Sequence, residues 1–274
     1  MTNDGQYWLS RFYFLMLLSF FSLSSSVSYA QTSGETLVRE QDVKLVWSAN
    51  NYGHGEQIYF SSYEKNRWGV PVQLSDTFDM VFQPACSFGA DRKVWAVWSR
   101  QDKNGSFLQY AVFNGSKWMS PVQIDTGMSN NKAVTIMVDG NNVPWIAWTA
   151  IDDMYPDVFL SRWNGKGWDA PVRVHEENNV PDVQPLLGLD EAGNVCLSWK
   201  MYAAGKYVTL SKVWNGRQWQ AVSSDPEKEI QKKVVQREKG GLPVPAFVED
   251  PRKATLFIKG QKGAVSLPLA LFTD

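Results

Sequence analysis

Short strand-like segments separated by turn residues recur along the chain. In the stretch 83–124, four such segments follow one another. The second, Val94–Trp98, is apolar on both faces, which indicates a strand covered on both sides. The pair Asn114-Gly115 before the fourth segment is typical of a tight turn. The pattern predicts a four-stranded antiparallel unit.

Two sets of tryptophans recur with a constant period. The first set is Trp47, Trp98, Trp148 and Trp199, and the second is Trp68, Trp118, Trp168 and Trp219. Successive members of each set are 50 or 51 residues apart. A repeat of this length with strand-like content is typical of a β-propeller. The repeat units run about 43–93, 94–143, 144–194 and 195–244, and 245–274 is interpreted as a degenerate fifth unit.

The sequence therefore predicts an all-β propeller of four-stranded blades. Five blades are expected, although four or six also fit the length. The last unit lacks an outer strand, and a portion of 35–42 is expected to supply either that strand or the inner strand of the first blade. Either arrangement closes the ring through the two ends of the domain, which protects the inner edges. Proline is tolerated on edge strands, so three residues mark the outer strand of a blade: Pro71, Pro121 and Pro171.

The first thirty residues are interpreted as a signal peptide. Arg11 precedes the apolar run Phe12–Leu23, and Ser28 and Ala30 form a small-x-small site for cleavage after Ala30. An uncut anchor is the alternative, but the run is short for a membrane span. We therefore expect a periplasmic or secreted protein whose single propeller domain is 31–274, with no membrane association after cleavage.

The formal charge argues against nucleic-acid binding, and the positions of the cysteines argue against a disulfide. The net charge is −1, so the chain lacks the overall positive field of a nucleic-acid binder. Two cysteines in an exported chain suggest a disulfide. However, Cys86 lies in the first strand of its unit and Cys196 in the second strand of a unit two further on. Their Cα atoms should lie beyond the ~7 Å limit for a disulfide, so two separate buried thiols are predicted.

Three Asn-Gly-x-x-Trp stretches carry a family resemblance. They begin at Asn114, Asn164 and Asn215. With the segments from Asp139-Gly140 to Trp148 and from Asp190 to Trp199, they resemble the bacterial-neuraminidase-repeat, or Asp-box, propellers. The resemblance implies a sialidase-like fold. The chain departs from the full motif, because the aspartate positions hold Phe113, Trp163 and Trp214. The enzymes of that family are therefore a poor guide to its chemistry.

One face of the propeller is expected to carry the function. The long polar connections between blades, and between the second and third strands, all fall on this face, and repeat proteins bind ligands through such loops. Amides, carboxylates and aromatic rings suit sugar hydroxyls and ring faces. One central site is expected. The candidate ligand-binding residues are Tyr52, His54, Arg100, Asp102, Asn131, Asp152, Asp153, Tyr155, His175 and Tyr202.

Several of these residues have simpler interpretations. The two histidines fall in predicted loops, where a surface position is the default, and their spacing makes a zinc site weak. Asp152, Asp153 and Asp157 could bind calcium, but aspartate is also a common loop residue. The tyrosines could cap the blades. No catalytic residue, metal or other cofactor is predicted, with calcium as the alternative. The charged segment 223–240 is expected to be a solvated loop, a short helix or a docking element.

The expected function is that of an exported, non-catalytic propeller that binds a carbohydrate or a peptide. A scaffold or assembly subunit is the first alternative. A sialidase-like glycoside hydrolase is the second. By resemblance, that enzyme would need an arginine cluster for the substrate carboxylate. On the loop face the sequence places Arg100, with Arg39 as the one further candidate. An ordinary hydrolase would need two carboxylates at a set separation.

Overall fold

The structure is a computed structural model that describes residues 38–51, 55–75, 77–151, 154–190, 192–222, 245–260 and 263–272. For 38–42, Gly260 and Gly263 it describes the backbone alone. The predictions outside this part of the chain are the signal peptide 1–30, the candidate residues Tyr52, His54, Asp152 and Asp153, and the charged segment 223–240.

Three blades are antiparallel meanders that follow the repeat units. Blade I comprises β5 (Met80–Phe88), β6 (Val94–Asp102), β7 (Gly105–Phe113) and β8 (Val122–Ile124). Blade II comprises β9 (Asn131–Val138), β10 (Pro144–Ile151), β11 (Pro156–Arg162) and β12 (Val172–Arg173). Blade III comprises β13 (Asp182–Leu189), β14 (Val195–Ala203), β15 (Lys206–Trp214) and β16 (Trp219–Val222). These blades confirm the predicted all-β propeller class.

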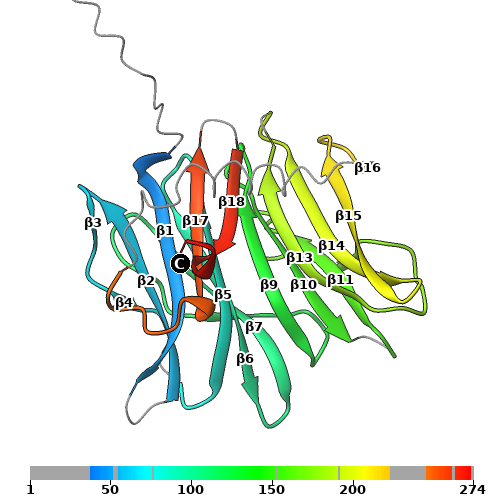
Figure 1. The fold of residues 1–274 in the computed structure, drawn as a ribbon, viewed down its shortest axis with the longest axis horizontal. Coiled ribbons are helices and arrows are strands. Elements are labelled where there is room, and N and C mark those ends of the chain that lie inside the picture. Colours follow the sequence, from blue (N-terminus) through cyan, green and yellow to red (C-terminus); the bar gives the residue numbers. More distant parts are fainter. Residues whose placement is uncertain are drawn as a thin grey trace, which may run out of the picture. The chain divides into compact units, whose positions relative to one another are not determined.

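The terminal blade combines both ends of the described chain. It contains β1 (Val38–Asn51), β2 (Gly55–Glu64), β3 (Arg67–Trp68), β4 (Val72–Gln73) and β17 (Ala254–Gly260). In Figure 1, β1 in blue lies beside β17 in orange, and Trp47 is paired with Ala254 in their antiparallel ladder. The expected closure by the two ends is therefore confirmed.

The C-terminal strands correct one expectation. Residues 245–272 do not form a separate fifth blade in the described part of the chain, because β17 takes the inner position beside β1. Strand β18 (Gly263–Pro268) follows, and its Val265 pairs with Gly188 of blade III. Nor do 38–42 form a strand of their own, since they begin β1. The count of five blades is thus not confirmed.

The short 3-10 helices η1 (Pro251–Lys253) and η2 (Leu269–Leu271) flank the C-terminal strands. None of the helices in the described ranges has the length and apolar character needed to cross a membrane.

The two tryptophan sets have different structural roles. The first set is buried, and Trp98 and Trp148 are 0% exposed. In blades I to III, the second tryptophan contacts an aromatic ring of the preceding blade: Trp118 lies on Phe60, Trp168 on Trp95, and Trp219 on Trp145, with ring centroids 4.9–6.0 Å apart. Aromatic pairs of this kind add about 0.5–1.5 kcal/mol each. The repeat period therefore reflects packing within blades and between them.

Both cysteines are reduced and buried, as predicted. Burial raises the pKa of the Cys86 thiol to about 12. Since the thiolate is the reactive species, we expect Cys86 to resist iodoacetamide at pH 8 in the native protein and to react in denaturant. A pKa raised from 9.0 to about 12 lowers the thiolate fraction about a thousandfold. Mass spectrometry of peptides labelled with and without urea checks this, and rapid native labelling of Cys86 would contradict it.

Candidate functional site

The connections between the second and third strands are shorter than expected. In blade I, β6 continues to Asp102 and β7 begins at Gly105, so a tight hairpin replaces the polar loop. Gly105 has φ +140, and a Cβ atom there would lie 2.1 Å from the backbone oxygen of Ser129. This position therefore requires glycine. Arg100 and Asp102 consequently lie on a strand and not in a loop.

A cavity of about 710 Å³ opens among the inner strands. Its wall includes residues of β5, β9, β13, β17 and β18, so each of the four described blades contributes to it. The polar lining residues are Ser48, Glu56, Gln83, Thr135, Gln184, Ser198, Lys200, Thr209, Arg252, Lys253, Thr255 and Ser266. The apolar ones include Phe82, Pro84, Pro185, Leu186, Trp199 and Pro268. This mixture of hydrogen-bonding groups and apolar ring faces is the composition of a small-ligand site.

Equivalent β-bulges shape the cavity wall in three blades. Gln83, Ala133 and Gln184 stand 50 or 51 residues apart and have φ +52, +52 and +54. The strand registers shift beside each of them. The Gln83 side-chain oxygen accepts a hydrogen bond of 2.8 Å from the Ala133 backbone N–H, which links two bulges. Left-handed non-glycine residues store strain and concentrate at functional sites, so the repeated bulges make this wall a candidate site.

The charged groups of the wall are mainly cationic. Lys200, Arg252 and Lys253 face a single lining carboxylate among the described residues, that of Glu56. Lys253 forms an ion pair with Glu56. Arg252 donates to both carboxylate oxygens of Asp250, over 2.9 and 3.0 Å, and these hydrogen bonds lower the pKa of Asp250. Because Asp250 and Glu56 offset the charges of Arg252 and Lys253, the excess positive charge of these groups is that of Lys200.

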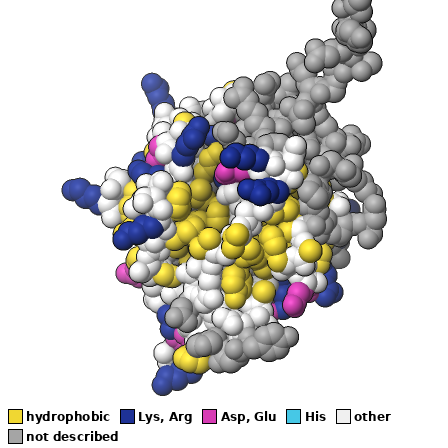
Figure 2. Space-filling view, turned by 90° about the vertical axis from the view of Figure 1, so that its left-hand side faces the viewer, with side chains coloured by type: hydrophobic (Ala, Val, Ile, Leu, Met, Phe, Trp, Pro, Cys, Tyr) yellow, Lys and Arg dark blue, Asp and Glu magenta, His cyan; other side chains and the backbone are white. Residues whose placement is uncertain are grey.

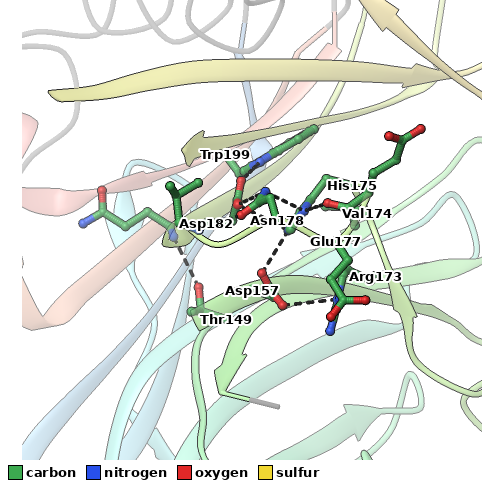
Figure 3. Close-up of polar contacts among 12 residues, drawn as sticks. Thr149, Asp157, Arg173, Val174, His175, Glu177, Asn178, Asp182 and Trp199 are labelled. Atoms are coloured by element: carbon green, nitrogen blue, oxygen red, sulfur yellow. Dashed lines mark hydrogen bonds and ion pairs between the residues drawn. The ribbon is translucent and has the colours of Figure 1, made fainter. Parts of the chain in front are cut away.

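A buried polar cluster lies behind this wall, between blades II and III (Figure 3). His175, which follows β12, places its Nε2 atom 3.5 Å from Oδ1 of Asp157 and 3.6 Å from Oδ2 of Asp182. The side chains are 8% exposed for His175 and Asp157 and 0% for Asp182. His175 is thus buried, and its expected surface position was wrong.

Further hydrogen bonds hold this cluster in place (Figure 3). Trp199, which also lines the cavity, donates from Nε1 to Oδ1 of Asp182 over 2.7 Å. Asn178 donates to the other oxygen of Asp182 over 2.9 Å. Arg173 lies 3.2 Å from Oδ2 of Asp157. Both carboxylates are therefore oriented by neighbouring donors.

The other described candidates do not meet at one central site. Arg100 lines a separate cavity of about 470 Å³ and pairs with Asp79 and Asp102. The Asn131 amide is buried and donates to the backbone oxygens of Ser106 and Met128. Tyr155 and Tyr202 are exposed. None of these described candidates lines the larger cavity, so they do not gather there.

Residues of the inner strands, together with residues of β14 and η1, line that cavity instead, and none of them was among the predicted loop candidates. One sequence signal could have found them: the pair Gln-Pro occurs at 83–84 and again at 184–185, at equivalent places in two units. Proline is confined to bulges and edges within sheets, so this recurrence marks a bulged inner strand.

The ion pair of Arg100 with Asp79 gives a pH-dependent prediction. The hydrogen bond from Arg100, 2.7 Å long, lowers the pKa of Asp79 below 3.8. We expect Arg100→Gln to cost about 0.2–1 kcal/mol at pH 7, because the pair is partly exposed. A lowered pKa stabilises the fold above the unfolded value, and this contribution is lost as the pH falls through the folded pKa. Urea titrations of both proteins at pH 7 and pH 2.5 test this; an unchanged difference at low pH would contradict it.

Hydrophobic side chains also gather on the surface where β2, β3 and β4 lie, at the left of Figure 1, with Lys and Arg side chains around them (Figure 2). Val70 and Val72, beside and within β4, are 86% and 41% exposed. Exposed apolar surface can serve contact with another protein, so the scaffold alternative stays open. The shortness of β4 and the adjacent Pro71 also protect this edge.

Comparisons with known proteins find distant likenesses among solved structures. The chain matches no protein-family model and no curated protein. Among solved structures, it is similar to the Hadza microbial sialidase Hz136, with 12% identity, TM-score 0.48, and coverage of 68% of this chain and 45% of the sialidase. An endo-arabinase from Bacteroides thetaiotaomicron has 11% identity, TM-score 0.41, and coverage of 84% and 94%.

A fungal lectin from Aleuria aurantia, described as a six-bladed propeller, has 14% identity, TM-score 0.36, and coverage of 67% of this chain and 64% of the lectin. The chain spans less than half of the sialidase's length. Because the identities are so low and each TM-score is below one half, these likenesses concern the fold alone and carry no activity over to this chain.

Proposed function

We propose that this protein is an exported, non-catalytic propeller that binds a carbohydrate in the cavity among its inner strands. The observation that carries the proposal is the lining of that cavity. Hydroxyls, amides and cations from all four blades surround it, together with the apolar surfaces of residues such as Phe82, Pro84 and Leu186. Fixed polar groups can bind sugar hydroxyls, while apolar surfaces can pack against the C–H face of a sugar ring.

The charges of the wall refine the ligand class. Lys200, Arg252 and Lys253 line the cavity with one carboxylate, Glu56, among the described residues. Cations raise the local concentration and affinity of anionic ligands. Sugars with a carboxylate are therefore expected to bind more tightly than neutral sugars of the same size.

The same lining favours binding over hydrolysis. An ordinary glycoside hydrolase needs two carboxyl groups on either side of the scissile bond, whereas Glu56 is the one described carboxylate in the wall and pairs with Lys253. A sialidase-like site would need several arginines for the substrate carboxylate, and the described lining contains Arg252 alone. Both observations support the non-catalytic function over the hydrolase alternative.

A calorimetric titration tests this proposal. Glucuronic acid and sialyllactose would be compared with glucose and lactose, first on the unaltered protein and then on Lys200→Ala. Lys206→Ala is the matched control, because Lys206 is an exposed lysine of the same hairpin that does not line the cavity. We expect Lys200→Ala to weaken binding of acidic sugars about tenfold, equivalent to about 1.4 kcal/mol, and Lys206→Ala to leave it unchanged. No binding of any sugar at millimolar concentration, or equal effects of the two variants, would contradict the proposal.

A further inference from the structure

We infer that Asp157, His175 and Asp182 form a binding site for one divalent transition-metal ion of the zinc class, which joins blade II to blade III. Asp157 lies on β11, His175 follows β12, and Asp182 begins β13. One donor atom from each of these three residues lies within 4.8 Å of the others. The inference concerns the interior of the fold and does not depend on sugar binding.

The position of the His175 Nε2 atom is the central observation. This atom is buried, has no hydrogen-bond partner among the described residues, and faces two carboxylate oxygens. On the other side of the ring, Nδ1 lies 2.8 Å from the backbone oxygen of Glu176. The Asn178 amide nitrogen also lies 3.3 Å from Nδ1, but it makes a shorter hydrogen bond of 2.9 Å to Asp182. A carbonyl oxygen can only accept, so the shorter contact at Nδ1, to Glu176, assigns the proton of a neutral ring to this atom. The Nε2 lone pair then points at two negative groups, an arrangement that a bound cation stabilises.

The distances around Nε2 suit a metal ion better than a direct hydrogen bond. The separations of 3.5 and 3.6 Å from the two carboxylates exceed the usual hydrogen-bond range of about 2.7–3.2 Å. Ligand atoms bonded to zinc at about 2.1 Å in a tetrahedron lie about 3.4 Å from one another. The observed separations of Nε2 from the two carboxylate oxygens are close to that distance between ligand atoms. An ion could therefore be held with little movement of these side chains.

The surroundings resemble the support that metal ligands need. Ligating histidines usually donate their second ring N–H to an oxygen, and ligating carboxylates are themselves hydrogen-bonded. Here Glu176 provides the oxygen for His175, and Trp199 donates to the Asp182 oxygen that faces away from the imidazole. Arg173 contacts the second oxygen of Asp157. Asn178 is held by the Val180 N–H, which fixes the orientation of its amide toward Asp182.

The donor set selects the class of ion. Imidazole nitrogen suits zinc, nickel, iron and copper, whereas calcium and magnesium prefer oxygen ligands throughout. The predicted calcium alternative is therefore not favoured at this cluster.

The cluster occurs at one blade junction and is absent from the preceding one. The positions 50 or 51 residues before its three members hold Phe107, Asp125 and Asn131. The preceding blade junction consequently lacks this set, and one ion per chain is expected.

The chain's two histidines make a direct test possible. In the His54→Gln protein, His175 is the only imidazole. After dialysis against EDTA, ¹⁵N-labelled His54→Gln protein would be titrated with ZnCl₂ while the two ring-nitrogen resonances are followed by NMR. We expect one equivalent of ZnCl₂ to shift the Nε2 resonance and leave Nδ1 protonated. The same protein should bind one zinc per chain by elemental analysis and show a higher Tm with zinc than with EDTA.

His175→Gln is the paired variant and should lose both the bound zinc and the rise in Tm. If this variant fails to fold, the NMR titration of His54→Gln still decides the question, because that protein retains the whole cluster. An Nε2 resonance that is unmoved by excess ZnCl₂ would overturn the inference. So would an Nε2 atom that is protonated at neutral pH in the presence of zinc, since the cluster would then be an imidazolium held by two aspartates.

Discussion

Trp98→Ala is expected to cost about 3–5 kcal/mol of unfolding free energy, as for other large core truncations. Trp98 is 0% exposed and belongs to the core cluster that includes residues of all four blades. Its removal leaves a cavity that the rigid blades cannot fill, and the Gln109 side chain loses the 3.0 Å hydrogen bond from the indole. A domain of this size shifts in Tm by about 2–4 °C per kcal/mol, so the Tm should fall by roughly 6–20 °C.

Thermal unfolding followed by circular dichroism measures this effect. Val70→Ala is the control, because Val70 is 86% exposed and such surface changes usually stay within about 0.5 kcal/mol. Equal melting temperatures for the two variants would show that Trp98 does not lie in the packed core.

Removal of residues 250–274 is expected to abolish the folded state. This truncation deletes β17 and β18, so β1 loses its inner neighbour and β13 loses its pairing with β18. It also removes four side chains with 0% exposure: Leu256, Phe257, Val265 and Leu267. Each is worth about 1.5–3 kcal/mol of burial, and their sum is comparable to the whole stability of a domain, about 5–15 kcal/mol.

Point variants show whether the truncated protein unfolds because it lacks the closing contacts or because the chain is shorter. Leu267→Ala is expected to cost about 2–5 kcal/mol, while Leu271→Ala, at a position that is 46% exposed, should stay within about 0.5 kcal/mol. Urea unfolding and size-exclusion chromatography compare these variants with the truncated protein. A truncated chain that still unfolds cooperatively at an unchanged midpoint would mean that closure by the C-terminal strands is dispensable.

The repeat made the blade architecture predictable from the sequence. The tryptophans of the first set occupy a fully covered strand, and most of the second set contact the neighbouring blade. The first role recurs in each described blade and the second in blades I to III, so the packing itself imposes the period. The reduced state of Cys86 and Cys196 followed from the same reasoning, because the repeat places them in separate blades.

The location of the candidate sites was much less predictable. The polar residues near Arg100 have the composition of a loop, but a cross-strand ladder extends β6 and β7 to a two-residue turn. Hydrogen bonding between strands can include polar residues that have no strand pattern of their own. The wall of the cavity depends on bulges at Gln83, Ala133 and Gln184, whose left-handed backbone is decided by neighbouring strands.

The sequence by itself determined an all-β chain of repeated four-stranded units, since alternation, turn pairs and the tryptophan period are local properties. Only the tertiary structure decided that β17 completes the terminal blade, and that Asp157, His175 and Asp182 meet between two blades. Both outcomes depend on which strand edges and side chains face each other after the blades pack. Such contacts join residues that are far apart along the chain and leave no periodic signal in it.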